Sequence, residues 1–301
     1  MDRVLVTGAC SFTGRHLLPQ LAAAPGGLVA TDVAAAGPAG AEYRPADLTD
    51  RARARELVEA VQPDLVYHLA GASTADAERC YAVNLGATRH LLEACAALPA
   101  PPRVVLVSSA AVYGLTRPGE SPVHEDTPLR PTTAYGASKA AAELFALALH
   151  RRGLVRVAVA RPFNLVGPGL RTGFAPSDFM AQALAIRAGG PPEIRVGALE
   201  PRRDFVDARD AVRAYSALAA TDGAWGAAWN VASGRPVAIG DLLERVLRAA
   251  GVEARVVPDP ARLGRVEVMD QVGDPARLER LTGWRPVVGL DASLRDMAGA
   301  A

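Results

Sequence analysis

Tyr135 and Lys139 stand four positions apart, and their side chains are suited to proton transfer. On a helix, residues four apart share one face, so the phenol and the ammonium reach the same point. A phenol with a pKa of about 10 carries protons poorly at neutral pH, and a neighbouring ammonium lowers that pKa toward the working range. The pair therefore indicates acid–base chemistry on a carbinol or ketone oxygen.

Lys139 is the only lysine in a chain that has 33 Lys and Arg residues. The other basic residues are all arginines. Keeping a single lysine among them indicates a site that needs a compact ammonium with three N–H donors rather than the planar guanidinium of arginine. The alternative is a surface lysine without a role.

Ser109 supplies a hydroxyl from the loop after the strand expected over 103–107. In open α/β sheets, ligands bind at the carboxyl ends of the strands, where this loop lies. Ser108 stands beside it, and two serines at a strand end often do no more than form hydrogen bonds within the loop. Ser109 is therefore a candidate because Tyr135 and Lys139 accompany it.

Strands and helices alternate through the first half of the chain. Short apolar runs predict strands over 4–6, 27–31, 64–68, 103–107 and 155–160, and the stretches between them predict helices over 14–24, 51–61, 84–98 and 134–151. This alternation is typical of a parallel sheet with right-handed crossovers. We therefore expect an α/β fold with a doubly wound parallel sheet, the Rossmann fold.

The pattern changes after Arg161-Pro162, where the chain becomes irregular and richer in Pro and Gly. Trp229-Asn230-Val231 again has the character of a short core strand, so the later chain interleaves with the sheet. We expect a nucleotide-binding domain from residues 1–163 together with 204–232. We expect a smaller domain from residues 164–203 and 233–301.

A glycine-containing turn joins the first strand to the first helix. Its candidate residues for binding a dinucleotide pyrophosphate are Gly8, Ser11, Phe12, Thr13 and Gly14. At this place backbone N–H groups and a helix N-terminus meet the phosphates. Ser11 occupies the middle glycine position of the usual motif, and an ordinary strand-to-helix turn is the alternative.

Asp32 lies 24 residues after Gly8, at the end of the second strand. An acidic residue there accepts hydrogen bonds from an adenosine ribose and repels a 2′-phosphate. Val33 follows it, so no arginine is adjacent, and the sequence favours NAD(H) while NADP(H) stays open. Further cofactor contacts are expected at the same edge of the sheet from Asp47, Leu48, Leu69, Ala70 and Gly71. For Asp47 the alternative is a helix N-cap.

Composition excludes several classes of protein. A net charge of +1 argues against nucleic-acid binding. The three cysteines and five histidines lack the spacing of a disulfide framework or a metal site, so no metal is expected. No apolar run approaches the roughly 20 residues of a membrane-spanning helix, and no signal-peptide pattern follows Met1. We expect a cytoplasmic protein without a membrane partner.

These motifs occur in a fixed order along nearly the whole chain. They are the turn 7–14, Asp32, His68-Leu-Ala70, Asn84, Ser109 to Gly114, Tyr135-Gly-Ala-Ser-Lys139 and Arg161-Pro-Phe-Asn164. As a set they resemble the extended short-chain dehydrogenase/reductases of the NAD-dependent epimerase/dehydratase family. The segments 161–169, 194–207 and 229–234 are most similar to reductases of GDP-4-keto-6-deoxyhexoses.

The resemblance implies a Rossmann domain that holds a nicotinamide cofactor and a carboxy-terminal domain that binds a nucleotide-diphosphate sugar. It implies cofactor contacts from Asn84, Tyr135, Lys139 and Pro162, and substrate contacts from Ser109, Asn164, Arg203 and Arg265. Arginine suits a diphosphate because its fork pairs with two phosphate oxygens. For Arg203, an ion pair with Asp204 or Asp207 is the alternative. Members of the family often pair through two helices, so a homodimer is expected through 84–98 and 134–151.

The reaction that the resemblance implies is reduction at C4 of a nucleotide-linked 4-keto-6-deoxyhexose. Tyr135 would protonate the developing alkoxide, Lys139 would tune Tyr135 and bind the nicotinamide ribose, and Ser109 would orient the substrate oxygen. The alternative is a C4 epimerase that uses the same residues with tightly held NAD, and Asp32 favours that alternative. A redox-sensing binding protein on the same fold would not need all three side chains.

Two departures from the family pattern concern the substrate. Ala110-Ala111 stand where dehydratases carry an Asp-Glu pair, and because alanines cannot move protons, elimination of water is not expected. The stretch 71–84 is several residues shorter than is usual in the family, and we expect this to change the shape of the entrance to the substrate-binding site.

Overall fold

The computed structural model of the chain describes residues 2–22, 26–117, 119–260 and 268–299. Its centre is a parallel sheet of seven strands in the order β10-β6-β5-β4-β1-β2-β3. The strands are β1 (Val4–Thr7), β2 (Leu28–Thr31), β3 (Glu42–Tyr43), β4 (Leu65–His68), β5 (Arg103–Val107), β6 (Arg156–Pro162) and β10 (Ala228–Val231). The order reverses between β1 and β4, which confirms the doubly wound sheet.

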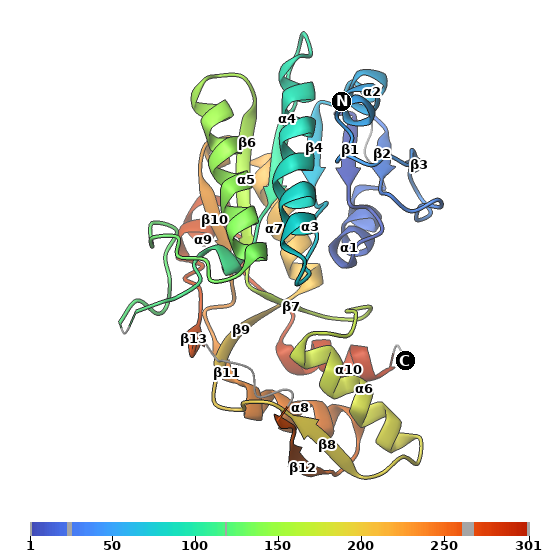
Figure 1. Ribbon diagram of the computed structural model, residues 1–301, viewed down its shortest axis with the longest axis vertical. Coiled ribbons are helices and arrows are strands. Elements are labelled where there is room, and N and C mark those ends of the chain that lie inside the picture. Colours follow the sequence, from blue (N-terminus) through green and yellow to red (C-terminus); the bar gives the residue numbers. More distant parts are fainter. Residues whose placement is uncertain (1, 23–25, 118, 261–267, 300–301) are drawn as a thin grey trace.

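Helices cover both faces of this sheet (Figure 1). One face packs against α1 (Phe12–Leu21) and α7 (Ala208–Ala220), and the other against α2 (Arg51–Val61), α4 (Thr88–Ala96) and α5 (Ala134–Arg151). Side chains alternate along each strand, so Val105 enters the first core and Val104 the second. Burial on both faces explains why these strands are continuous apolar runs.

The helix expected over 84–98 differs from the prediction. A short α3 (Ala77–Cys80) is followed by the π-helix η1 (Tyr81–Ala87), and α4 begins only at Thr88. In this π-helix, Asn84 is buried and bonds to both the N–H and the C=O of Ala72, at 2.8 and 2.9 Å. π-turns are rare and often occur at functional sites.

Beyond the carboxyl ends of the strands lies a smaller part of the molecule (Figure 1). Its helices are α6 (Ala175–Arg187), α8 (Ile239–Ala250) and α10 (Leu290–Gly299), which enclose a separate apolar core. Its strands are β7 (Asn164–Val166), β8 (Glu193–Val196), β9 (Arg202–Asp207), β11 (Pro236–Ala238), β12 (Arg255–Pro258) and β13 (Asp270–Gln271). Strand β9 is central, because β7, β11 and β13 all pair with it. Helix α9 (Ala276–Thr282) returns to the large sheet, where its Leu278 enters the core beside α7.

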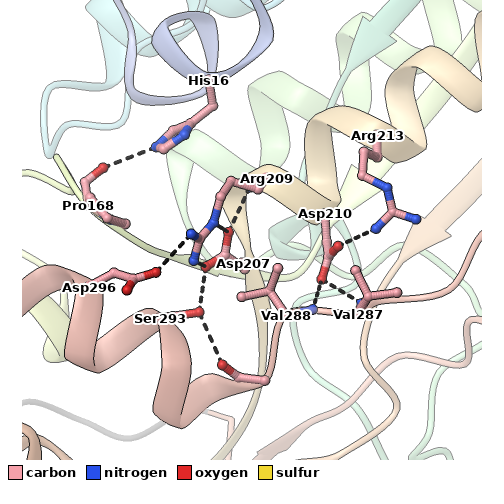
Figure 2. A network of polar contacts seen from close by, with 11 residues as sticks. His16, Pro168, Asp207, Arg209, Asp210, Arg213, Val287, Val288, Ser293 and Asp296 are labelled. Atoms are coloured by element: carbon pink, nitrogen blue, oxygen red, sulfur yellow. Dashed lines mark hydrogen bonds and ion pairs between the residues drawn. The ribbon is translucent and has the colours of Figure 1, made fainter. Parts of the chain in front are cut away.

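A polar network at the start of α7 joins the two parts (Figure 2). Asp207 caps α7 and accepts hydrogen bonds from Arg209 at 2.8 Å and from Ser293 of α10 at 2.5 Å. Arg209 also pairs with Asp296 of α10, at 2.8 Å. From α1, the ring of His16 contacts the carbonyl of Pro168 at 3.0 Å. The smaller part is therefore fixed to the large sheet by charged groups as well as by the chain.

Candidate active site

Ser109 and Tyr135 meet at the carboxyl end of β5. Ser109 begins a 3-10 turn (Ala110–Val112), and its Oγ accepts a hydrogen bond from the N–H of Ala111 at 3.1 Å. Helix α5 starts one residue before Tyr135, because the hydroxyl of Thr133 caps it through the N–H of Gly136 at 3.1 Å. The phenol is thereby brought near the serine hydroxyl.

The electrostatics of Tyr135 differ from the expectation. Burial raises the pKa of Tyr135 above its usual value, and the nearby hydroxyl of Ser109 and the charge of Arg171 oppose that rise only in part. In the protein alone Lys139 does not bring this pKa below its usual value, and its ammonium donates to the carbonyl of Val107 at 2.9 Å. The predicted lowering, which also depends on a bound nicotinamide, stays a prediction. Desolvation of the phenol therefore outweighs the neighbouring charges.

Lys139 is buried, with 5 % of its surface exposed, so it is not a surface lysine. Burial lowers the pKa of Lys139 from 10.5 to about 8, while the nearby Glu143 carboxylate acts in the opposite direction. A Cβ added at Gly71 would lie 2.9 Å from its Nζ and 3.1 Å from Oδ1 of Asn84. The ammonium thus occupies a tight space between the glycine and the amide.

The glycine turn has the form that a pyrophosphate requires. Gly8 has a φ of 67°, and a Cβ there would lie 2.6 Å from the backbone nitrogen of Ala70. Ser11 is the N-cap of α1, with its Oγ 3.0 Å from the N–H of Gly14, which explains how serine replaces a glycine. The N–H groups of Phe12 and Thr13 begin the helix and have no acceptor within it. These residues fit a dinucleotide by shape and by hydrogen-bond donors.

Asp32 follows β2 beside this turn. Its two carboxylate oxygens accept hydrogen bonds from the N–H groups of Cys10 at 2.9 Å and Val33 at 2.8 Å. These bonds hold the carboxylate at the edge where a ribose would lie. The alternative role of Asp47 is wrong, because Asp50 caps α2 and Asp47 bonds to Thr49 instead.

The other predicted cofactor residues follow their strands at the same edge. Leu48 and Leu69 are buried, Ala70 and Gly71 lie in the turn after β4, and Pro162 ends β6. Asn84 bonds to Ala72 and to the Ser138 hydroxyl, the latter at 2.9 Å, so it fastens the turn to α5.

Two of the predicted substrate residues, Asn164 and Arg203, lie on the smaller part. Asn164 donates to the carbonyl of Asp204 at 3.0 Å. Arg203 donates to the carbonyls of Arg202, Val268 and Met269, at 2.8, 3.0 and 3.2 Å. Within the described residues it pairs with neither Asp204 nor Asp207, so the ion-pair alternative is wrong. Arg265 lies outside the described residues.

Three charged residues near the site were given no role from the sequence. Arg171 lies 3.4 Å from the carbonyl of Ser73, and its charge opposes the rise in the pKa of Tyr135. Glu143 and Arg161 form a buried ion pair at 2.7 Å behind Lys139. For Glu143 the signal was its position four residues after Lys139, whereas the contact with Arg161 of β6 depends on the fold.

Over the residues that the structure describes, no helix is long and apolar enough to cross a membrane. The same residues contain no group of three or more His, Cys, Asp or Glu side chains that could hold a metal ion.

Comparison with known proteins places these features in a family. Residues 4–232 match the model of the NAD dependent epimerase/dehydratase family. A GDP-6-deoxy-D-mannose reductase of Pseudomonas aeruginosa is 35 % identical over 98 % of this chain and 95 % of its own.

Two solved structures extend the likeness to the fold. RMD of Pseudomonas aeruginosa, solved with NADPH, has a TM-score of 0.86 at 32 % identity and covers 100 % of this chain and 98 % of its own. The UDP-glucose 4-epimerase of Thermus thermophilus, solved with NAD, has a TM-score of 0.87 at 27 % identity, with coverages of 99 % and 98 %. The resemblance drawn from the motifs is thus confirmed, and the chain belongs to the NAD-dependent epimerase/dehydratase family.

Proposed function

We propose that the protein reduces the C4 keto group of a nucleotide-linked 4-keto-6-deoxyhexose. The observation that carries the proposal is the gathering of Ser109, Tyr135 and the buried Lys139 at the carboxyl end of β5, where the Lys139 ammonium donates to the carbonyl of Val107 at 2.9 Å. Two hydroxyl groups so placed can both bind one substrate oxygen. A relative at 35 % identity that is named as a GDP-6-deoxy-D-mannose reductase supports the choice of substrate class.

The protein's part in the reaction is acid catalysis. A bound nicotinamide supplies the hydride. Tyr135 donates its phenolic proton to the oxygen that becomes the new hydroxyl, and Ser109 orients that oxygen. Because burial holds the pKa of Tyr135 above its usual value, the phenol keeps its proton at neutral pH and is ready to act as the acid. Lys139 binds the nicotinamide ribose.

The cofactor is held by the glycine turn and by the strand ends beside it. Gly8, Ser11, Phe12, Thr13 and Gly14 take the pyrophosphate, and Asp32 takes the adenosine ribose. Contacts to the rest of the cofactor come from Asp47, Leu48, Leu69, Ala70, Gly71, Asn84, Tyr135, Lys139 and Pro162.

We infer a preference for NAD(H) over NADP(H). The Asp32 carboxylate is fixed by two backbone N–H groups, so it cannot easily turn away from a 2′-phosphate. The negative charge of this carboxylate would repel the negative 2′-phosphate of NADP(H). The NADPH in the similar Pseudomonas structure makes this preference worth measuring directly.

The diphosphate of the substrate is bound by Asn164 and Arg203, with Arg265. The guanidinium of Arg203 is desolvated, which lowers its pKa, and its partners in the described residues are carbonyls. A partly buried cation whose acceptors among the described residues are carbonyls suits an incoming phosphate, because charge-assisted bonds are stronger than those to carbonyls.

Three further proposals concern organisation. Residues 1–163 with 204–232 form the cofactor domain, and residues 164–203 with 233–301 form the substrate domain. The protein is a homodimer through α4 and α5, where Leu144 is 59 % exposed. It works in the cytoplasm on a small nucleotide sugar.

The test follows the absorbance of the reduced nicotinamide. Purified protein receives NADH or NADPH with GDP- and dTDP-linked 4-keto-6-deoxy sugars, and the Tyr135→Phe variant serves as the control. We expect oxidation of the cofactor by at least one keto sugar and none in the variant. Failure with every keto sugar would refute the reductase.

A C4 epimerase is the second candidate, because Asp32 favours NAD, which an epimerase regenerates in each cycle. The likeness to the Thermus epimerase supports it as well. Bound NAD in the purified protein, together with interconversion of a UDP-sugar and no consumption of NADH, would establish this reaction instead.

A further inference from the structure

Glu143 continues the spacing of Tyr135 and Lys139 along α5. The three residues are four apart, so their side chains follow one another on the same face of the helix. Only 1 % of the surface of Glu143 is exposed. A carboxylate so deeply buried is costly unless it is paired.

Arg161 of β6 provides that pairing. Its Nε lies 3.1 Å from each carboxylate oxygen of Glu143, and its Nη2 lies 2.7 Å from one of them. Arg161 is itself 5 % exposed. The carboxyl group of Glu143 is therefore paired through two N–H groups with a guanidinium that retains its proton.

The guanidinium is fixed from its other side. Its Nη1 donates to the hydroxyl of Tyr113 at 2.9 Å and to the carbonyl of Glu125 at 3.0 Å. The hydroxyl of Tyr113 donates in turn to Asn230 of β10, at 2.6 Å. Arg161 thus cannot move away from Glu143 without breaking a network that links β6, β10 and the loop before α5.

Lys139 has titratable or charged neighbours on several elements. On α5 these are Tyr135 and Glu143, on β6 Arg161, and at the end of β4 His68. Burial and the charge of Lys139 lower the pKa of His68 to about 3, so this imidazole is neutral. Its ring nitrogens are within hydrogen-bond distance of Thr7 and Thr88. The carboxylate that opposes the desolvation of Lys139 is therefore Glu143.

We propose that Glu143, held by Arg161, is a positioning residue whose negative charge keeps Lys139 protonated at the pH where the enzyme works. Glu143 touches no reacting atom and acts through the lysine. Its effect on turnover rests on the proposed function, whereas its effect on the charge of Lys139 does not.

The single lysine of this chain allows a direct test. The protein is produced with a purification tag that contains no lysine and is grown on lysine labelled with carbon-13 at the ε position. Its NMR spectrum then contains one lysine side-chain signal, which belongs to Lys139 and can be followed through a pH titration. We expect a midpoint near pH 8 in the natural protein. In Glu143→Gln we expect the midpoint to fall by at least about one unit, since a nearby opposite charge typically moves a pKa by about 1–3 units.

Glu143→Gln also leaves Arg161 unpaired in the interior, which can prevent folding. The double variant Glu143→Gln/Arg161→Met removes both charges and avoids that penalty. We expect its lysine midpoint to stay below the natural value. A midpoint equal to that of the natural protein would show that Glu143 merely neutralises Arg161, and would overturn the proposal.

Two further variants serve as controls for the lysine midpoint. Glu143→Asp keeps the charge, and its midpoint should stay within about half a unit of the natural one. Glu56→Gln removes an exposed carboxylate from α2 and should change nothing. A fall in Glu56→Gln as large as that in Glu143→Gln would contradict a local effect.

Turnover provides a second readout. Where Lys139 must be protonated, the alkaline limb of kcat/KM should move to lower pH in Glu143→Gln. For a fall of one unit we expect a loss of about fivefold at pH 8 that nearly vanishes at pH 6, whereas damage to the fold would lower activity equally at both. If no keto sugar is reduced by the natural protein, the proposed function fails, and the NMR titration still decides the role of Glu143.

Discussion

Replacing Lys139 by methionine should abolish activity and stabilise the fold. A pKa of about 8, against 10.5 for an exposed lysine, means that burial disfavours the ammonium by roughly 3 kcal/mol, at about 1.4 kcal/mol per pKa unit. Methionine has a similar length and no charge. It also loses the hydrogen bond to Val107, worth about 1 kcal/mol. The net expectation is a gain of about 2 kcal/mol in the free energy of unfolding at pH 7.

This gain should depend on pH in one direction. Because the folded-state pKa of Lys139 lies below the unfolded one, the penalty in the natural protein is complete below pH 8 and disappears as the pH rises from 8 to 10.5. The advantage of Lys139→Met should therefore shrink over that interval. Above pH 10.5, the natural protein should be more stable than Lys139→Met by about 1 kcal/mol, the contribution of the hydrogen bond to Val107.

Urea unfolding of both proteins at pH 7 and pH 10 measures the effect. Comparing the two proteins at each pH cancels the titration of other groups, such as the buried tyrosines. Leu149→Met on the same helix is a matched control, because it exchanges one buried apolar side chain for another and should show no dependence on pH. An equal difference between natural protein and Lys139→Met at both pH values would refute the desolvation of this lysine.

Other substitutions test the remaining roles. Tyr135→Phe should lower kcat by roughly 10²–10⁴-fold, measured by nicotinamide absorbance, with the Kd for cofactor within about twofold of the natural value; retained activity would refute the acid. Asp32→Ala should weaken NAD binding about tenfold in calorimetry and relax the bias against NADP, and an unchanged preference would argue against its ribose contact. Lys139→Arg keeps the charge, yet should be nearly inactive, because Gly71 and Asn84 leave no room for a guanidinium. Light scattering should give twice the 31.3 kDa chain mass for the natural protein and a smaller mass for Leu144→Asp, and a monomer in both would refute the dimer.

The sequence predicted the elements best where local signals were strong. The bounds of α5 and β5 agree with the expectation, because a helix of 18 residues and a short β-branched run each carry their own signal. The π-helix around Asn84 could not be predicted, since it depends on hydrogen bonds to Ala72 and Ser138 that only the tertiary fold brings near.

The electrostatics of the site were the hardest to predict. Spacing alone places Lys139 beside Tyr135 and suggests a lowered phenol pKa. The structure shows that desolvation dominates, and desolvation depends on the segments that cover the phenol. In the same way, the partner of Glu143 lies 18 residues away on a neighbouring strand, a pairing that helical periodicity cannot reveal.

The path of the chain through the smaller part has a consequence for engineering. The chain leaves the large sheet after β6, returns from β9 directly into α7, leaves again after β10, and returns in α9. The smaller part, which we propose binds the substrate, is therefore assembled from separated stretches, and Asp207 at the end of β9 is also the cap of α7. A hybrid made with one crossover point would combine mismatched halves of this smaller part. Transplanting the specificity of a relative would require exchanging the segments around β7–β9 and β11–β13 together, with the α7 junction left intact.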